Sequence, residues 1–252
     1  MLSKLEIDRY SRHILLREVG GTGQQKLKAA RVLCVGAGGL GSPVIEYLAA
    51  AGVGTLGLVD DDRVSLSNLQ RQVIHSTAKV DQLKVFSAAE RVDALNPNVK
   101  VELHPVRLGA DNAQKLVERY DIVVDGTDNF PTRFLVADTA YALRKPLVTA
   151  GVLEFYGSLT TLLPFATGAN GESNPSWRCL MPREPDTAAL TCSQVGILGA
   201  VVGVLGTLAA CEVLKLITGV GEPLIGRLLM VDVRDMAFDI VDYKRNPASP
   251  AF

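Results

Sequence analysis

The sequence predicts an α/β protein: a single domain built on a doubly wound, Rossmann-like, mostly parallel sheet with an antiparallel extension at its C-terminal end. Three features predict this fold. Short apolar runs alternate with segments of helical spacing between residues 31 and 150. A glycine-rich turn, at residues 36–41, directly follows the first apolar run. After Gly151 the pattern changes, and residues 158–163 alternate in the manner of an antiparallel strand.

The elements follow in chain order. The segment 1–30 is mostly polar and amphipathic, and we expect helix over residues 5–29. The expected parallel strands are buried apolar runs at 31–35, 54–59, 99–103, 120–124 and 146–150. The expected helices between them lie at 43–51, 84–95, 113–119 and 132–143. The single domain covers residues 1–252. After the parallel strands we expect a flexible loop at 166–193 and then a C-terminal part, 194–252, with a helix, a strand at 228–233 and a polar tail.

The composition excludes several classes of protein. The chain has 252 residues, 48% of them hydrophobic, as in globular rather than collagen-like or disordered proteins. Its 26 basic residues are balanced by 27 acidic ones, so we expect no nucleic-acid partner. No two of the four cysteines have C-x-x-C spacing, and the first residues are too charged for a signal peptide, so we expect a cytoplasmic protein.

The uncharged run 195–211 has two interpretations. Gly199 and Gly203 have the G-x-x-x-G spacing of packed membrane helices. The run is shorter than the roughly 20 residues that span a bilayer, and it continues into Glu212 and Lys215. We therefore expect a buried helix, packed against the sheet or a second subunit, and no membrane association.

The glycine-rich turn predicts a nucleotide site. Gly36, Gly38 and Gly41 fit G-x-G-x-x-G between a strand and a helix, and Asp60 ends the next strand. Glycines permit close approach of the backbone, the helix start attracts phosphate, and the carboxylate suits a ribose hydroxyl. The core at 31–150 is therefore predicted to bind a nucleotide, and a dinucleotide and ATP both fit this motif.

Charged loops after successive strands favour a triphosphate. Arg71, Lys84 and Arg133 provide cations, and Asp128 provides a carboxylate able to hold Mg²⁺. Because parallel strands end at one edge of the sheet, these loops should converge on the glycine turn. A phosphoryl or nucleotidyl transfer site needs such charges. The residues expected around the nucleotide are Gly36, Gly38, Gly39, Gly41, Asp60, Asp62, Ser67, Asn68, Leu69, Gln70, Arg71, Lys84, Asp128, Asn129 and Arg133.

Several strings resemble those of a known family and occur in the same order. They are Arg9-Tyr10-Ser11-Arg12, the stretches 35–41 and 65–72, Gln82-Leu83-Lys84, Thr127-Asp128-Asn129 and Leu190-Thr191-Cys192. On these strings the chain resembles the MoeB/ThiF family of ubiquitin-activating-like adenylyltransferases of molybdopterin and thiamine biosynthesis. The molybdopterin-synthase adenylyltransferases are the most similar branch.

The resemblance implies an activity and a partner. Members of this family form homodimers and use ATP with Mg²⁺ to adenylate the C-terminal glycine of a small ubiquitin-like sulfur-carrier protein ending in Gly-Gly, releasing pyrophosphate. The resemblance implies that Gly39 and Asp60 contact ATP and that Asn68, Arg71 and Lys84 bind its phosphates. It implies that Asp128 binds Mg²⁺. It also implies that Arg12, assisted by Arg9, contacts the ATP of the neighbouring subunit.

This chemistry needs no general base. A C-terminal carboxylate has a pKa of roughly 3.3–3.7 and is already ionised at neutral pH. It can attack the α-phosphorus of ATP directly, once fixed cations offset the repulsion between two anions. The three histidines form no recognisable triad. His13 is the nearest to the expected site, and we expect His75 and His104 to be ordinary loop residues.

The sequence departs from the family at a metal site. Many MoeB-type members hold a structural zinc ion with two C-x-x-C pairs. Here Cys179 is alone, with Ser176, Ser249 and Phe252 in the other places. A tetrahedral zinc site needs four nitrogen or sulfur ligands. We therefore predict no structural zinc.

Cys192 has two interpretations. In some relatives a cysteine accepts the acyl group as a thioester or forms a persulfide-linked conjugate. Cys192 ends the flexible loop just before a helix, whose N-terminus would lower the pKa of the thiol. The alternative is a helix-capping residue with no covalent role.

Three other functions remain open at this point. The first is adenylation of a small-molecule or tRNA-nucleoside carboxylate. The second is an NAD-dependent oxidoreductase, which enhancement of nicotinamide fluorescence would reveal. The third is a binding module that has lost catalysis, and such a module would bind ATP without turnover.

Overall fold

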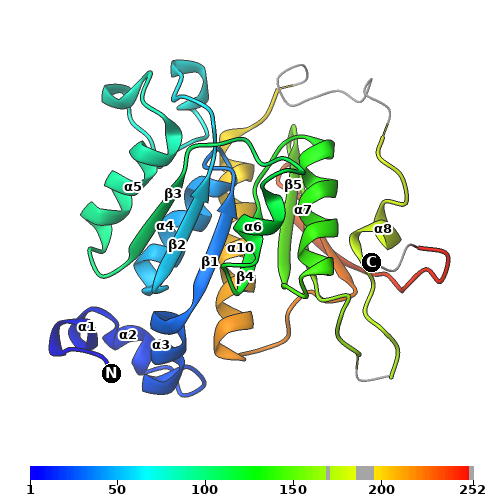
Figure 1. The fold of residues 1–252 in the computed structure, drawn as a ribbon, viewed down its shortest axis with the longest axis horizontal. Helices are drawn as coiled ribbons and strands as arrows, with labels where there is room; N and C mark the ends of the chain where they lie inside the picture. The colour runs from blue at the N-terminus through cyan, green and yellow to red at the C-terminus, as the bar shows by residue number, and fades with distance from the viewer. Residues whose placement is uncertain (169–170, 186–195, 250–252) are drawn as a thin grey trace.

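One eight-stranded sheet, in the order β3-β2-β1-β4-β5-β6-β7-β8, runs through the part of the protein that the computed structural model describes, residues 1–168, 171–185 and 196–249 (Figure 1). Strands β1 to β5 are parallel to one another, and β6, β7 and β8 pair antiparallel. This confirms the predicted sheet with its antiparallel extension. The strands are β1 Arg31–Val35, β2 Thr55–Val59, β3 Lys100–His104, β4 Ile122–Asp125, β5 Leu147–Leu153, β6 Tyr156–Leu162, β7 Arg227–Asp232 and β8 Ala237–Asp242.

Helices cover both faces of the sheet and enclose two apolar cores. Helices α4, α5 and α10 bury Leu48, Val92 and Leu205 on one face, and α6 and α7 bury Val117 and Phe134 on the other. In Figure 1, α6 and α7 lie on the near face, and α4 and α10 lie behind the sheet. The described helices are α1 Lys4–Arg9, α2 Ser11–Ile14, α3 Gly20–Ala29, α4 Gly41–Ala51, α5 Lys84–Leu95, α6 Ala113–Val117, α7 Phe130–Ala142, α8 Trp177–Leu180 and α10 Gly199–Thr218.

The predicted polar tail contains a strand that the sequence did not indicate. Strand β8 pairs with β7 along its whole length. Its side chains are mostly exposed, Phe238 and Ile240 among them, because β8 is an edge strand beyond the helical layer. The turn before it places Met236 at a φ of 53°, a left-handed conformation that favours glycine. The sequence of β8 therefore lacks the apolar pattern of a buried strand, and its turn lacks the expected glycine. For these two reasons the sequence did not reveal the hairpin of β7 and β8.

The N-terminal segment, predicted to be helical, forms three short helices at the amino end of β1. Tyr10, the residue that connects α1 and α2, is buried, and its hydroxyl accepts a hydrogen bond from Asn96 Nδ2 at 2.8 Å. A Cβ added at Gly52 would lie 2.4 Å from the Tyr10 ring, so glycine permits this contact. Arg9 Nη1 donates to the Leu95 carbonyl at 2.9 Å. Arg9 and Tyr10 thus fasten the segment to the end of α5.

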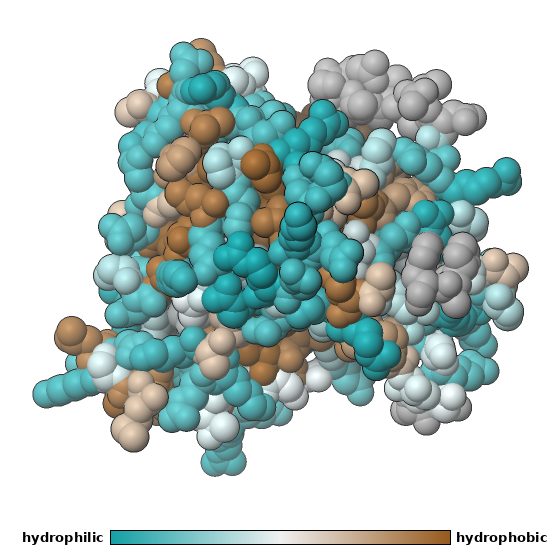
Figure 2. All heavy atoms as spheres, in the orientation of Figure 1, coloured by the Kyte–Doolittle hydropathy of each residue, from teal (hydrophilic) through white to brown (hydrophobic). Residues whose placement is uncertain are grey.

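The outer surface of this segment combines apolar residues with an exposed arginine. Leu5, Leu15 and Leu16 are 79%, 71% and 56% exposed. Figure 2 shows apolar, brown residues at the lower left, where α1 and α2 project. Arg12 is exposed and makes no hydrogen bond or ion pair with any residue in the described part of the chain. Helix α2, which carries Arg12, lies at the opposite end of the sheet from the loops that follow β1, β2 and β4 (Figure 1).

Helix α10 has the length and mean hydropathy, 2.0, of a membrane span, yet its contacts are those of a core helix. It packs on α4, β5 and β6. A Cβ added at Gly206 would lie 2.3 Å from Pro43 Cγ, so glycine permits the close crossing with α4. Glu212 is buried, and its Oε2 accepts hydrogen bonds from Thr161 Oγ1 at 2.5 Å and Leu224 N at 2.7 Å. These contacts fit the expected buried helix.

Candidate active site

A cavity of about 810 Å³ opens at the carboxyl ends of the parallel strands. It lies where the strand order reverses, between β1 and β4. Open α/β sheets bind ligands at this switch point, and the volume suits a nucleotide. The residues of the cavity lining that the sequence predicted are Gly36, Gly38, Gly39, Asp60, Asp62, Arg71, Lys84, Asp128, Asn129 and Arg133.

The glycine turn begins this site. Gly36 has a φ of +95°, and a Cβ added at Gly41 would lie 2.0 Å from the Gly36 carbonyl oxygen, so α4 starts against the turn only with glycine at both positions. The Ala37 N–H donates to Asp60 Oδ2 at 2.8 Å, and the Asp62 N–H donates to Asp60 Oδ1 at 2.9 Å. Burial raises the pKa of Asp60 from its ordinary value. Asp60 therefore orients the turn as well as lining the cavity.

Two cations line the cavity from the segment that follows β2. Arg71 donates from Nη2 to Asn68 Oδ1 at 3.2 Å and from Nη1 to the Ser67 carbonyl at 3.4 Å, so its own loop orients it. Lys84 is the first residue of α5 and only 4% exposed. Its Nζ lies 2.7 Å from Asp62 Oδ2. A largely desolvated ammonium group of this kind interacts strongly with a phosphate.

Asp128 and Asn129 reach the cavity from the loop after β4 with different roles. The Asp128 side chain is exposed and has no hydrogen bond or ion pair with a described residue. Asn129 caps α7, since its Oδ1 accepts from the Thr132 N–H at 3.0 Å. Magnesium prefers carboxylate oxygens. The unengaged carboxylate of Asp128 therefore fits the predicted Mg²⁺.

Arg133 lines the cavity, but its guanidinium group binds the protein. One nitrogen, Nη2, donates to the Thr127 carbonyl at 2.7 Å and to the Ala150 carbonyl at 2.9 Å. Its Nε lies 3.2 Å from Oδ2 of the buried Asp125. The guanidinium carbon is 5.8 Å from the centre of the Trp177 ring. These contacts connect the end of β4 to the middle of β5, a positioning role that the sequence did not indicate.

The other predicted residues lie behind the lining or away from it. Ser67 and Asn68 orient Arg71. Gln70 packs at the start of α10, where a Cβ on Gly199 would lie 2.2 Å from the Gln70 carbonyl oxygen. Cys192 lies outside the described residues, so its covalent role stays a prediction. The predicted nucleotide-binding residues that do not line the cavity are Gly41, Ser67, Asn68, Leu69 and Gln70.

Comparison with known proteins gives the family. The ThiF family model matches residues 10–251. The chain belongs to the ThiF family. It is 46% identical over 249 residues to the sulfur carrier protein adenylyltransferase of Thermus thermophilus, covering 98% of this chain and 91% of that protein. It is 46% identical to the SAMP-activating enzyme E1 of Haloferax volcanii, covering 99% of this chain and 90% of that one.

Some relatives are longer. The chain is 44% identical to the probable adenylyltransferase/sulfurtransferase MoeZ of Mycobacterium tuberculosis, covering 99% of this chain but only 63% of that protein. Among solved structures, E. coli MccB has a TM-score of 0.82 at 22% identity, over 98% of this chain and 74% of that one. The fold is thus confirmed, as is the interpretation as an adenylyltransferase enzyme of MoeB/ThiF type.

Two lining residues of this ThiF-family chain were missed as site residues. Gln72 and Trp177 are buried, and Gln72 Oε1 and Trp177 Nε1 have no hydrogen-bond partner in the described structure. Buried polar atoms are normally paired, so both fit a site that accepts a polar ligand. The signals were present: Gln72 ends the string 65–72, and Trp177 is the only tryptophan.

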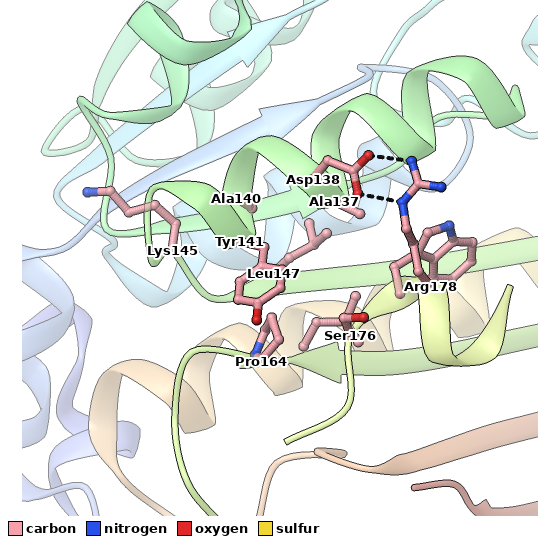
Figure 3. A pocket seen from close by; sticks show the side chains of 11 residues that line it. Ala137, Asp138, Ala140, Tyr141, Lys145, Leu147, Pro164, Ser176 and Arg178 are labelled. Carbon is pink, nitrogen blue, oxygen red and sulfur yellow. Dashed lines mark hydrogen bonds and ion pairs between the residues drawn. The ribbon is translucent and has the colours of Figure 1, made fainter. Parts of the chain in front are cut away.

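A second, much smaller cavity of about 10 Å³ lies between α7 and α8 (Figure 3). Arg178 donates to the two carboxylate oxygens of Asp138 at 2.6 and 3.1 Å, and Figure 3 marks both hydrogen bonds by dashed lines. The space admits at most about one water molecule. It is therefore no nucleotide site, and its contacts fasten α8 to α7.

Three of the four positions considered for a zinc site, Ser176, Cys179 and Ser249, lie together, and the fourth, Phe252, lies outside the described residues. Cys179 Sγ accepts from the Asn246 N–H at 3.3 Å and the Ser176 N–H at 3.4 Å, and Ser176 Oγ lies 3.4 Å from Ser249 Oγ. Burial works against ionisation, but the hydrogen bonds from Ser176 and Asn246 bring the pKa of Cys179 below its ordinary value. One thiol and two hydroxyls do not fit tetrahedral zinc.

We therefore expect a zinc chelator to leave the melting temperature of the protein unchanged. Replacing Ser176, Ser249 and Phe252 together by cysteine should give four thiols, and Zn²⁺ should then raise the melting temperature by several degrees, at about 2–4 °C per kcal/mol. The matched control adds Cys179→Ser to the triple variant, which removes one ligand. Stoichiometric zinc in the purified wild-type protein would contradict the prediction.

Proposed function

We propose that this protein uses ATP and Mg²⁺ to adenylate the C-terminal glycine carboxylate of a small ubiquitin-like sulfur-carrier protein ending in Gly-Gly. The main support is the convergence of Arg71, Lys84 and the unengaged Asp128 carboxylate on the glycine turn, in one cavity of nucleotide size. The name of the Thermus thermophilus relative, sulfur carrier protein adenylyltransferase, supports the class of partner.

The reaction depends on positioning and charge. The ionised carboxylate of the carrier forms a bond to the α-phosphorus as the bond to the β-phosphate oxygen breaks, giving an acyl-adenylate and pyrophosphate. Arg71 and Lys84 offset the negative charge that otherwise keeps the two anions apart. Asp128 would hold Mg²⁺, which would supply further positive charge to the phosphates when bound. No histidine is among the described residues of the cavity lining, which suits a reaction without a general base.

The same proposal includes a homodimer in which Arg12 acts on the partner's nucleotide. Helix α2, which carries Arg12, lies at the opposite end of the sheet from the strand ends that line the cavity, so one chain does not bring Arg12 to its own cavity (Figure 1). The apolar surface around Arg12 and the outer side of α10 from Gly203 to Cys211, which carries no charge, support an interface. On that side Cys211 is exposed, and a Cβ added at Gly203 would meet nothing within 4 Å. A symmetric dimer would cover such surfaces in both copies.

Pyrophosphate exchange tests the proposed function. With ATP, Mg²⁺ and a purified carrier ending in Gly-Gly, labelled pyrophosphate should enter ATP, because formation of the acyl-adenylate is reversible. The matched control is the same carrier without its last glycine, and it should give no exchange above background. Exchange that needs no carrier but needs a small carboxylic acid would replace the proposal with the small-molecule alternative. ATP binding without any exchange would indicate a binding module.

A further inference from the structure

His75 lies inside the protein, where a loop residue was expected. It is 7% exposed and sits between the glycine turn and α5. Its Nε2 lies 2.9 Å from the Ala37 carbonyl oxygen, and its Nδ1 lies 2.9 Å from Ser87 Oγ. Ser87 is one helical turn after Lys84. The ring therefore connects the turn that starts the nucleotide site to the helix that presents a phosphate-binding cation.

The partners of the ring define its protonation. A carbonyl oxygen only accepts hydrogen bonds, so Nε2 carries the proton, and Nδ1 then accepts from the Ser87 hydroxyl. Burial lowers the pKa of His75, and the nearby Lys84 ammonium group lowers it further, while the bond to Ala37 opposes them. His75 is thus a neutral imidazole with both nitrogens engaged.

The peptide groups on both sides of Ala37 are held. Asp60 accepts from the Ala37 N–H, which belongs to the preceding peptide group, at 2.8 Å. His75 donates to the Ala37 carbonyl, which belongs to the following one. In a trans peptide the C=O and the next N–H point in opposite directions. Holding the Ala37 carbonyl toward His75 therefore turns the Gly38 N–H away from His75. Gly38 lines the cavity, and His75 does not.

The amides of the turn are available for a ligand. Neither the Gly38 nor the Gly39 N–H donates a hydrogen bond to any residue that the structure describes. Unpaired N–H groups at the start of a helix are a binding site for phosphate. Their direction decides whether they can donate to it. Within the described residues, the only side-chain hydrogen bonds on the Ala37 backbone are those of Asp60 and His75.

We infer that His75 is a positioning residue for the phosphates of the nucleotide: its bond to the Ala37 carbonyl aims the Gly38 amide into the cavity. The inference rests on the proposed function only in taking a nucleotide phosphate as the ligand, and it does not depend on the carrier. His75 takes no part in proton transfer.

Two substitutions of His75 test this role. The side-chain amide of one takes the place of ring atom Nε2, and that of the other takes the place of Nδ1. The side-chain amide of His75→Gln places an N–H donor near the position of Nε2, so it keeps the bond to Ala37. The amide of His75→Asn reaches only the position of Nδ1 and leaves the buried carbonyl unpaired. Calorimetric titration with ATP and Mg²⁺ should show affinity within about twofold of wild type for the glutamine variant and on the order of tenfold weaker binding for the asparagine variant.

Adenosine serves as the matched ligand, because it has the base and ribose but no phosphate. Its affinity should be the same for wild type and both variants. Ser87→Ala removes the hydroxyl that contacts His75 Nδ1 and leaves the bond to Ala37 in place. This variant should therefore weaken ATP binding less than His75→Asn does. Equal ATP affinity of the glutamine and asparagine variants, or equal loss of ATP and adenosine binding, would overturn the inference. The titrations contain no carrier protein, so their outcome is independent of the pyrophosphate-exchange test of the proposed function. Pyrophosphate exchange can fail while the difference in ATP affinity between the glutamine and asparagine variants persists.

Discussion

Arg71→Ala and Asp128→Ala should each reduce carrier-dependent pyrophosphate exchange by a factor on the order of 100 to 1,000, the usual effect of removing one fixed group that stabilises developing charge. Arg71 is half-buried beside the glycine turn, where a Cβ on Gly39 would lie 3.6 Å from its Cγ. Asp128 lines the cavity, and its carboxylate has no hydrogen bond or ion pair with a described residue. Both losses should appear in kcat/KM for the carrier.

The two variants should keep the fold of the wild type. The polar contacts of Arg71 are confined to its own loop, and Asp128 has none with a described residue, so neither substitution leaves a buried charge unpaired. Melting temperatures close to that of the wild type will check this. Arg91→Ala is the matched control, because Arg91 is a half-exposed arginine on α5 that pairs with Glu46 away from the cavity. Exchange at the wild-type rate in either Arg71→Ala or Asp128→Ala would refute its assignment.

The position of the candidate site could be predicted because it follows from where the strands end. Gly36 comes directly after β1, Asp60 directly after β2, and Asp128 shortly after β4. Parallel strands deliver such residues to one edge of the sheet whatever lies between them. Lys84 was predicted as the first residue of a helix, and α5 begins there. Local sequence was therefore enough to place the charges around the turn.

The supporting contacts were not predictable, because they join segments that are distant in the sequence. Arg133 has the charge and spacing of a phosphate ligand, and only the structure shows the Ala150 carbonyl and Asp125 carboxylate beside it. His75 meets a carbonyl 38 residues earlier in the chain, and no periodicity or motif reports such a contact. The hairpin of β7 and β8 was missed for a different reason, since an exposed edge strand lacks the apolar pattern of a buried one.

Arg12→Ala should lower exchange about a thousandfold, as loss of an arginine that stabilises phosphoryl charge from a neighbouring subunit does. The substitution should not affect folding, because Arg12 is exposed and makes no hydrogen bond or ion pair with a described residue. Arg9→Ala is the comparison in the same helical segment. Arg9 bonds to Leu95 of its own chain, so its loss should act mainly on stability.

A mixture of Arg12→Ala and Asp128→Ala subunits then distinguishes action between subunits from action within one. In a mixed dimer, the subunit that lacks Arg12 still has Asp128, and it receives Arg12 from its partner, so one complete site forms. The other site lacks both groups. Random pairing of equal amounts makes half of the dimers mixed, so about a quarter of wild-type exchange should return. If each site used its own Arg12, every site in the mixture would lack one group, and co-expressed subunits would stay as inactive as either variant alone.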